Sequence, residues 1–128
     1  MSDMRELVAL FRAETADHLT KLDNGLVELE KQPDQTELVK SLNREIHTLK
    51  GAARVFGFKD IQDIAHRIED IFVGVIERRV AFNSRVAGEI FKGLDGIRGL
   101  LRNIDERKGP ETEPTLSEIC RGLEGCTL

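Results

Sequence analysis

Residues 36–56 have the sequence TELVKSLNREIHTLKGAARVF, and this stretch decides the fold class. On a helical wheel of roughly 100° per residue, its apolar side chains form one narrow stripe. That stripe consists of Leu38, Leu42, Ile46, Leu49, Ala53 and Phe56. His47 lies about 140° from the stripe, so the helical period predicts that its ring faces water. Gly51 shares the face of His47 one turn later.

Gly51 is unusual at this place, because a glycine inside a helix is about 0.5–1 kcal/mol less favourable than alanine. Its position beside His47 indicates that a large partner must approach the imidazole ring. Most exposed histidines have no function, so this hypothesis depends on which other residues share the face.

Composition narrows the class of protein further. The chain has 128 residues, of which 40% are hydrophobic and 33% charged, with a net charge of -4 and no Trp or Tyr. No segment alternates with period two, so we expect an all-α fold. Basic residues are scattered among acidic ones, which argues against a nucleic-acid surface. No apolar run approaches the ~20 residues of a membrane span, and no signal peptide is recognisable.

The two cysteines, Cys120 and Cys126, are too few for a disulfide framework, and no histidine follows them at zinc-binding spacing. We therefore predict reduced thiols without a special role and a cytoplasmic chain.

Five helices are predicted along a single domain. They cover about residues 4–31, 35–55, 59–78, 84–108 and 115–125, with a linker at 109–114. The boundary signals are the pairs Asp3 with Glu6 and Thr115 with Glu118, the breakers Pro33 and Gly57, and the cap at Asn83.

Four long amphipathic helices with short connections are typical of an antiparallel up-down four-helix bundle. The fifth, short helix has few apolar positions, so we expect it to lean on the bundle. Gly93, Gly96 and Gly99 fall within the apolar period of the fourth helix, where they favour close helix packing.

The tight turn at Gly57 makes the second and third predicted helices antiparallel neighbours. Residues equally far from this turn lie at the same level. This rule places His47 level with Glu69 and Lys50 level with His66. We therefore predict that these four side chains cluster in one exposed patch.

The chemistry of these residue types suits nucleophilic phosphoryl transfer. A carboxylate such as Glu69, accepting the proton of one ring nitrogen, would orient His47 and leave its other nitrogen as a nucleophile. Lys50 could meet a phosphoryl oxygen as a point charge. Arg54 could extend a positive rim for an anionic partner.

Other interpretations of the same residues stay open at this point. His47, His66 and Glu69 could hold a metal ion, although nothing obvious closes that site off from water. The patch could equally be a docking surface without chemistry. His18, near the buried face of the first helix, is better explained as a packed residue than as a site.

The sequence His47-Thr48-Leu49-Lys50-Gly51, followed by Gly57-Phe58, resembles the phosphoacceptor motif of histidine-containing phosphotransfer (HPt) domains. The likeness is strongest to the N-terminal HPt domain of CheA-type chemotaxis histidine kinases, and it covers about residues 4–125. Residues 11–30 resemble the first helix of that subfamily and residues 65–70 the third. The trailing fifth helix is also a feature of it.

This resemblance implies a role for each residue of the patch. His47 would accept a phosphoryl group on Nε2, and Glu69 would hydrogen-bond the other ring nitrogen. Lys50 and His66 would tune the reactivity, while Gly51 would clear space for the partner. The residues Val55 and Phe56 depart from the usual smaller residues before Gly57, which bears on the choice of partner.

The sequence therefore predicts a phosphocarrier that takes its phosphoryl group from a histidine kinase catalytic domain and gives it to an aspartate of a response regulator receiver domain. The chain would be the N-terminal module of a CheA-like kinase or, alternatively, a free-standing HPt protein of a hybrid-kinase relay. Its glycines form no nucleotide loop, so we expect no cofactor in this domain and place ATP and magnesium on the partner domains.

Overall fold

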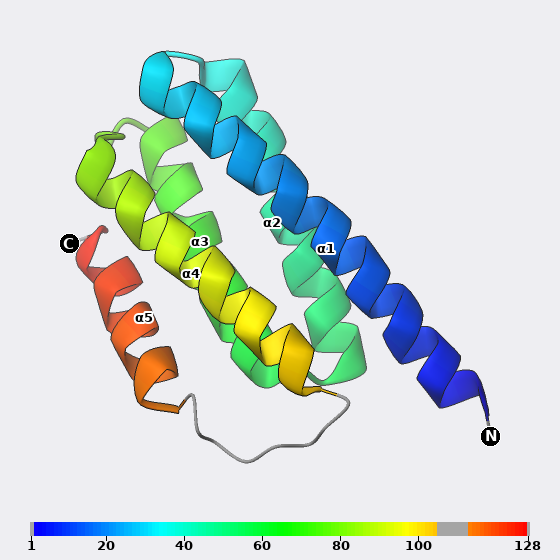
Figure 1. The fold of residues 1–128 in the computed structure, drawn as a ribbon. Helices are drawn as coiled ribbons and strands as arrows, with labels where there is room; N and C mark the ends of the chain where they lie inside the picture. The colour runs from blue at the N-terminus through cyan, green and yellow to red at the C-terminus, as the bar shows by residue number, and fades with distance from the viewer. Residues whose placement is uncertain (1, 105–112, 128) are drawn as a thin grey trace.

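The computed structural model describes residues 2–104 and 113–127, and the side chains of residues 4–104 and 118–127. The helices in these ranges are α1 (Ser2–Lys31), α2 (Thr36–Phe56), α3 (Lys59–Ile76), α4 (Ser84–Asn103) and α5 (Glu113–Gly125), and the same ranges contain no strand. The predicted all-α class is confirmed. Four helices run up and down side by side, while α5 lies against α3 and α4 (Figure 1). None of the described helices combines the length and apolarity needed to span a membrane.

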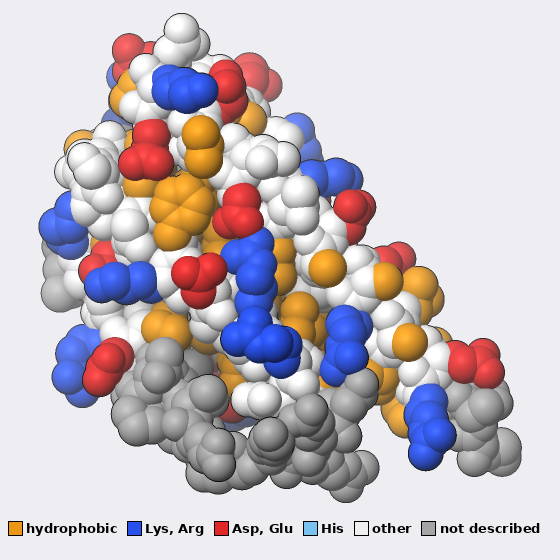
Figure 2. All heavy atoms as spheres, in the orientation of Figure 1, with side chains coloured by type: hydrophobic (Ala, Val, Ile, Leu, Met, Phe, Trp, Pro, Cys, Tyr) orange, Lys and Arg blue, Asp and Glu red, His pale blue; other side chains and the backbone are white. Residues whose placement is uncertain are grey.

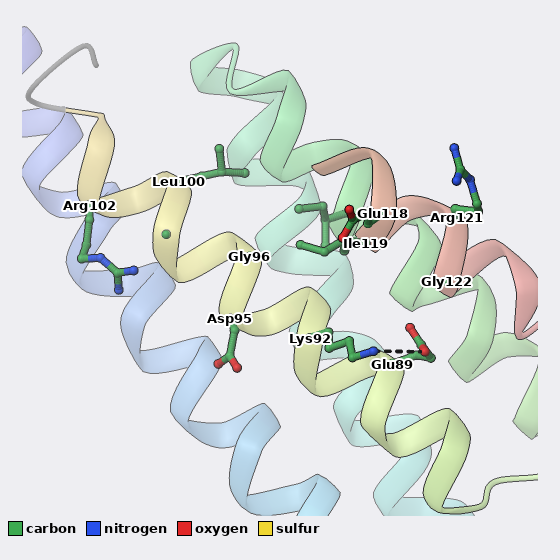
Figure 3. Close-up of a pocket in the computed structure, with 12 residues that line it drawn as sticks. Glu89, Lys92, Asp95, Gly96, Leu100, Arg102, Glu118, Ile119, Arg121 and Gly122 are labelled. Atoms are coloured by element: carbon green, nitrogen blue, oxygen red, sulfur yellow. Dashed lines mark ion pairs between the residues drawn. The ribbon is translucent and has the colours of Figure 1, made fainter. Parts of the chain in front are cut away.

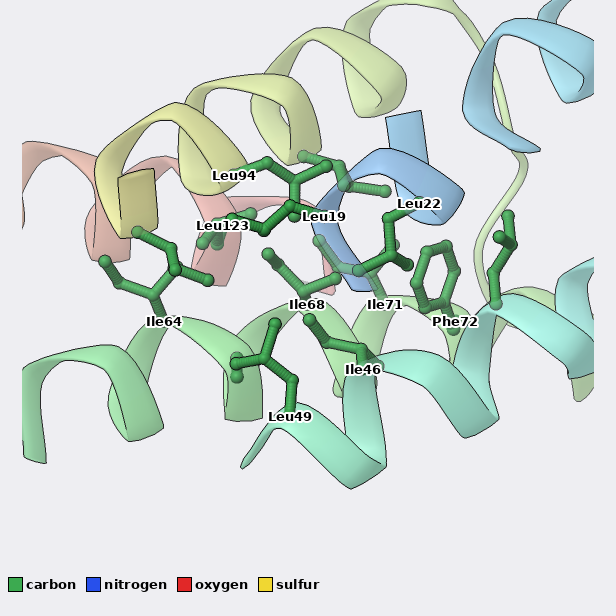
Figure 4. Packing of buried hydrophobic residues seen from close by; sticks show 14 of the residues in the cluster. Leu19, Leu22, Ile46, Leu49, Ile64, Ile68, Ile71, Phe72, Leu94 and Leu123 are labelled. Carbon is green, nitrogen blue, oxygen red and sulfur yellow. The ribbon is translucent and has the colours of Figure 1, made fainter. Parts of the chain in front are cut away.

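The core lies between the four long helices, and aliphatic side chains fill it (Figure 4). Its fully buried members include Leu19, Leu22, Ile46, Leu49, Ile64, Ile68, Ile71, Phe72 and Leu94. The apolar stripe predicted for residues 36–56 contributes Leu42, Ile46, Leu49 and Ala53 to this core. Val39, outside that stripe, is also buried, whereas Leu38 and Phe56 of the stripe are only partly so. Leu123 of α5 joins the same cluster.

The turn between α2 and α3 is formed as the sequence predicts. Gly57 has φ +77°, in the left-handed region that glycine adopts without steric cost. The amide of Gly57 donates to the carbonyl of Arg54 at 3.1 Å, and the amide of Phe58 donates to that of Ala53 at 2.9 Å. These bonds satisfy the last carbonyls of α2 and reverse the chain, so that α3 packs antiparallel to α2.

One helix end falls earlier than the sequence predicts. α3 ends at Ile76 instead of residue 78, because Arg78 has φ +64° and leaves the helical region. The structure describes α4 as far as Asn103, and its predicted end near residue 108 lies outside the described residues. Near the end of the described part of α4, the guanidinium of Arg12 on α1 donates to the carbonyl of Leu101 at 3.0 Å, which also accepts from the amide of Ile104 at 3.3 Å. Residues 105–112 lie outside the described part of the chain.

The starts of α1 and α5 also correct the prediction. α5 begins at Glu113, so Thr115 lies inside the helix and does not cap it. Pro114, predicted to belong to the linker, occupies the first turn, where its missing amide proton costs nothing. α1 begins at Ser2, so Asp3 is likewise within the helix and is not its cap. The predicted cap of α4 is confirmed, because Asn83 Oδ1 accepts from the amide of Val86 at 2.9 Å.

Glycines allow α5 to lie close against α4 (Figure 3). A Cβ atom at Gly96 would come within 2.5 Å of Ile119 Cδ1, and one at Gly122 would collide with the Glu89 carboxylate. At Gly93 a Cβ atom would approach Ile68, Ile64 and Leu123. Close helix packing, predicted for these glycines of α4, is confirmed at Gly93 and Gly96. Gly99 instead lies at the edge of a hollow of about 650 Å³ between α4 and α5.

Candidate functional site

His47 and Glu69 meet across the α2–α3 pair. The Nδ1 atom of His47 lies 2.6 Å from Oε2 of Glu69. The histidine side chain is 66% exposed and the glutamate side chain only 15%. The predicted level placement of the two residues is therefore confirmed, with one correction, because Glu69 is not an exposed residue. The Glu69 carboxylate is mostly buried and contacts the exposed ring through Nδ1.

Lys50 engages the other oxygen of the same carboxylate. Its Nζ atom lies 2.5 Å from Oε1 of Glu69, and the lysine side chain is 23% exposed. Partial burial alone would raise the pKa of Glu69. The hydrogen bonds from Lys50 and His47, together with the attraction of their charges, outweigh burial and hold that pKa below its ordinary value. Glu69 is accordingly a carboxylate at neutral pH.

The ionised state of Glu69 decides which nitrogen of His47 is reactive. A carboxylate can only accept hydrogen bonds, so Nδ1 must carry the proton of the contact. In the neutral ring, Nε2 then keeps its lone pair. Because the side chain is largely exposed, this lone pair is open to attack a partner's electrophile. The site thus contains an oriented ring nitrogen that can act as a nucleophile, and a negative charge placed to stabilise a cation on the ring.

The surface beside His47 is open. A Cβ atom added at Gly51 would meet no atom within 4 Å, which agrees with the predicted clearing. Arg54, expected to add positive charge, is exposed on the same side of α2. The hollow between α4 and α5 is lined by other residues, and the His47 side chain is largely exposed. On the face of α1 and α4 drawn in Figure 2, charges of both signs are interspersed and no histidine is visible.

His66 does not join the cluster as predicted. Its Nε2 atom lies 3.5 Å from Asp70, one turn further along α3, and both side chains are more than half exposed. Within the described ranges, no group of three His, Cys, Asp or Glu residues is arranged to hold a metal ion. The metal-site interpretation of His47, His66 and Glu69 therefore receives no support from the geometry.

One feature was missed by the sequence analysis. His18 on α1 pairs with Glu45 on α2, with Nδ1 and Oε1 2.6 Å apart. Its side chain is 22% exposed, which agrees with the predicted packed position. The histidine–carboxylate pair itself depends on how α1 is rotated against α2, and the helical period of either helix alone does not fix that rotation.

Comparison with known proteins identifies the family to which this site belongs. The family model described as "Hpt domain" matches residues 6–106. This chain belongs to the Hpt domain family. The matched residues include α2, α3 and α4 and most of α1, and therefore both helices that carry the pair of His47 and Glu69.

Relatives of this Hpt domain agree in sequence and in structure. The chemotaxis protein CheA of Halobacterium salinarum is 36% identical over 101 residues, which cover 79% of this chain and 15% of that protein. CheA of Listeria monocytogenes is 33% identical over 118 residues, covering 92% of this chain and 19% of that protein. The chain thus spans less than a fifth of either relative.

The structure is similar to solved phosphotransfer domains as well. The solution structure of the histidine phosphotransfer domain of CheA superposes with a TM-score of 0.85, at 28% identity, covering 95% of this chain and 92% of that chain. The phosphorylated P1 domain of CheA3, in complex with CheY6 from R. sphaeroides, gives a TM-score of 0.78 at 25% identity, with coverage of 94% and 98%. The fold of this chain is therefore that of CheA P1 domains, with α5 included.

Proposed function

We propose that this chain carries phosphoryl groups in a two-component relay, with His47 as the acceptor. One observation carries the proposal, namely the 2.6 Å contact between Nδ1 of His47 and the Glu69 carboxylate beneath an exposed ring. The same contact leaves Nε2 with its lone pair and gives it an unobstructed approach over Gly51.

In the first step, Nε2 of His47 attacks the γ-phosphorus of ATP that a kinase catalytic domain holds. A bond forms between nitrogen and phosphorus while the bond to the ADP oxygen breaks, so ADP leaves. The ring keeps the proton on Nδ1 and gains positive character, which the carboxylate of Glu69 stabilises. Lys50, already held by Glu69, supplies a positive charge near the transferred group.

In the second step, a carboxylate oxygen of an aspartate in a receiver domain attacks the phosphorus. The nitrogen–phosphorus bond breaks and its electron pair returns to Nε2, which restores the neutral ring. Phosphoryl transfer of this kind needs positioning and charge stabilisation more than covalent chemistry by the protein. We assign the magnesium ion and the acidic groups that hold it to the partner domains.

The whole polypeptide in this proposal is a CheA-like chemotaxis kinase of the cytoplasm. The two similar P1 domains and the two CheA relatives support this assignment. A free-standing HPt protein, the alternative from the sequence, would use the same site with a separate kinase.

The test uses radiolabelled ATP, magnesium and the purified chain, with and without the catalytic domain of a CheA kinase. We expect one acid-labile, base-stable label per chain only when the kinase domain is present. Adding a CheY-type receiver should then move the label to the receiver. Labelling of the chain by ATP and magnesium alone would contradict the relay and indicate an unrecognised kinase activity.

A further inference from the structure

A hollow of about 640 Å³ lies at the end of the bundle where the α1–α2 and α3–α4 connections are (Figure 1). Its size is in the range of cavities that hold small molecules. Neither His47 nor Glu69 belongs to its lining. Val39, which does, precedes His47 by eight residues, or about 12 Å along α2. The hollow is therefore separate from the phosphoacceptor site.

A tight hydrogen-bonded turn after α3 forms one side of this hollow. The amides of Arg79 and Val80 both donate to the carbonyl of Gly74, at 2.8 and 3.1 Å. The amide of Arg78 donates to the carbonyl of Val75 at 3.1 Å. These bonds form a Schellman motif, in which the residue at position 78 has to adopt the left-handed conformation.

An arginine occupies this left-handed position. Arg78 has φ +64°, and it is alone in having a positive φ among the described residues other than glycine. Glycine adopts this conformation without steric cost, whereas the Cβ atom of an arginine crowds the following carbonyl oxygen. Gly57 fills the corresponding position after α2, with φ +77°. Arg78 thus suits the turn less well than glycine would, and a function of its side chain would explain its presence.

The guanidinium group of Arg78 is open to a ligand. It lines the hollow, and no ion pair or hydrogen bond joins its side chain to another described residue. The neighbouring Arg79 differs, because Glu77 accepts from its guanidinium at 2.7 and 2.9 Å. Asp34 is the acidic residue of the lining, and it forms no ion pair with Arg78.

We propose that this hollow binds a small monocarboxylate with an apolar body, and that Arg78 recognises the carboxylate. A planar guanidinium can donate two parallel hydrogen bonds to a carboxylate. The partly buried side chains of Val75, Ile76 and Phe82 offer apolar surface to the rest of the ligand. Asp34 adds a negative charge to the lining, which disfavours ligands with two or more negative charges.

The experiment titrates the isotope-labelled chain with benzoate and follows its amide chemical shifts by NMR. We expect saturable shifts around the hollow, among them those of Val39, Val75 and Ala81. Acetate has the charge without the apolar body, and benzyl alcohol has the body without the charge. Each should therefore bind at least about tenfold more weakly than benzoate. Benzoate shifts that do not saturate, or equal affinity for benzoate and benzyl alcohol, would overturn the proposal.

Two variants test the residues of the hollow. Arg78→Gly removes the guanidinium and the steric strain together, so benzoate should bind at least about tenfold more weakly while the midpoint of urea unfolding rises. Ala81→Phe keeps Arg78 but fills space in the hollow, and it should weaken benzoate binding by a similar factor.

Arg79→Gly is the matched control, because this adjacent arginine neither lines the hollow nor has a positive φ. Its affinity for benzoate should stay within about twofold of wild type, and its urea midpoint should not rise. If Arg78→Gly bound benzoate as tightly as this control, the proposal would be wrong. A lower urea midpoint for Arg78→Gly would show that Arg78 serves the turn itself, and would also overturn the proposal. These measurements involve no phosphorylation, so their failure would leave the relay through His47 untouched.

Discussion

Among the described residues are two histidine–glutamate pairs with the same distance from Nδ1 to the carboxylate oxygen and very different surroundings. His47 and Glu69 join α2 to α3, whereas His18 and Glu45 join α1 to α2, each through Nδ1 at 2.6 Å. The ring of His47 is 66% exposed, and that of His18 is 22% exposed. In both pairs a carboxylate contacts Nδ1 of the ring, and the two pairs differ in how freely a reactant can reach the rest of the ring.

The neighbours of the two pairs differ as well. Glu69 holds Lys50 on its second oxygen, and Gly51 leaves the approach to His47 open. His18 is only 22% exposed and contacts Glu45 of the neighbouring helix, so it offers a phosphoryl donor less access than His47 does. We therefore interpret the pair of His18 and Glu45 as a helix-to-helix contact and the pair of His47 and Glu69 as a reactive site.

The largest expected difference is in phosphoryl acceptance. His47→Gln should abolish labelling by a CheA catalytic domain, because no nucleophile remains at the open face. His18→Gln should be labelled at the wild-type rate. Radiolabel incorporation with circular dichroism as the folding control measures both. Labelling of His47→Gln at the wild-type rate would sink the assignment of the acceptor.

Substitution of the two glutamates should change the phosphorylation rate to different extents, a difference that is smaller than for the histidines but still large. Glu69→Gln keeps the shape but loses the charge that stabilises the reacting ring, so we expect phosphorylation to slow by about 10²-fold, the lower end for a positioned acid–base group. Glu45→Gln should leave the rate within about twofold of wild type. Single-turnover labelling at saturating kinase domain gives the rates. Equal rates for the two variants would mean that Glu69 does not orient His47.

The free energy of unfolding should rank the two histidine variants in the opposite order. His18→Gln breaks a half-buried contact between α1 and α2, so we expect the free energy of unfolding to fall by about 1 kcal/mol. His47→Gln changes an exposed ring and should alter it by less than about 0.5 kcal/mol. Urea unfolding followed by circular dichroism measures both values. A larger loss for His47→Gln would assign the exposed pair a structural role.

The smallest effect concerns pH. The pKa of Glu69 is lower in the folded chain than its ordinary value of 4.5. A group with a lowered pKa stabilises the fold above its unfolded pKa and loses that contribution as pH falls through the folded value. The advantage of wild type over Glu69→Gln should therefore be constant near neutral pH and shrink below about pH 4.5. Urea unfolding at several pH values tests this, and an advantage that grows towards acid would contradict it.

Helical periodicity predicted the features that depend only on a single pair of helices and the turn between them. Counting residues from Gly57 was enough to place His47 beside Glu69, because a tight turn fixes the register of two antiparallel helices. The same count could not predict that His66 pairs with Asp70, because this contact lies within α3 and does not depend on the turn.

Features that depend on distant segments were not predictable in this way. The carbonyl of Leu101 in α4 accepts from Arg12, which is 89 residues away in the sequence. The contact of His18 with Glu45 depends on the rotation of α1 about its own axis. The burial of Glu69 likewise depends on how closely α2 and α3 pack together. A helical wheel of one helix does not show this.

The glycine contacts between α4 and α5 have a consequence for alignment. Gly96 of α4 receives Ile119 of α5, and Gly122 of α5 receives Glu89 of α4. In these two contacts, each helix supplies one glycine and one side chain that packs over the glycine of the other helix. A slip of α5 by one turn, about 5.4 Å, would separate both side chains from the glycines that they contact. Only one axial alignment satisfies both, so α5 is fixed along its length as well as held against the bundle.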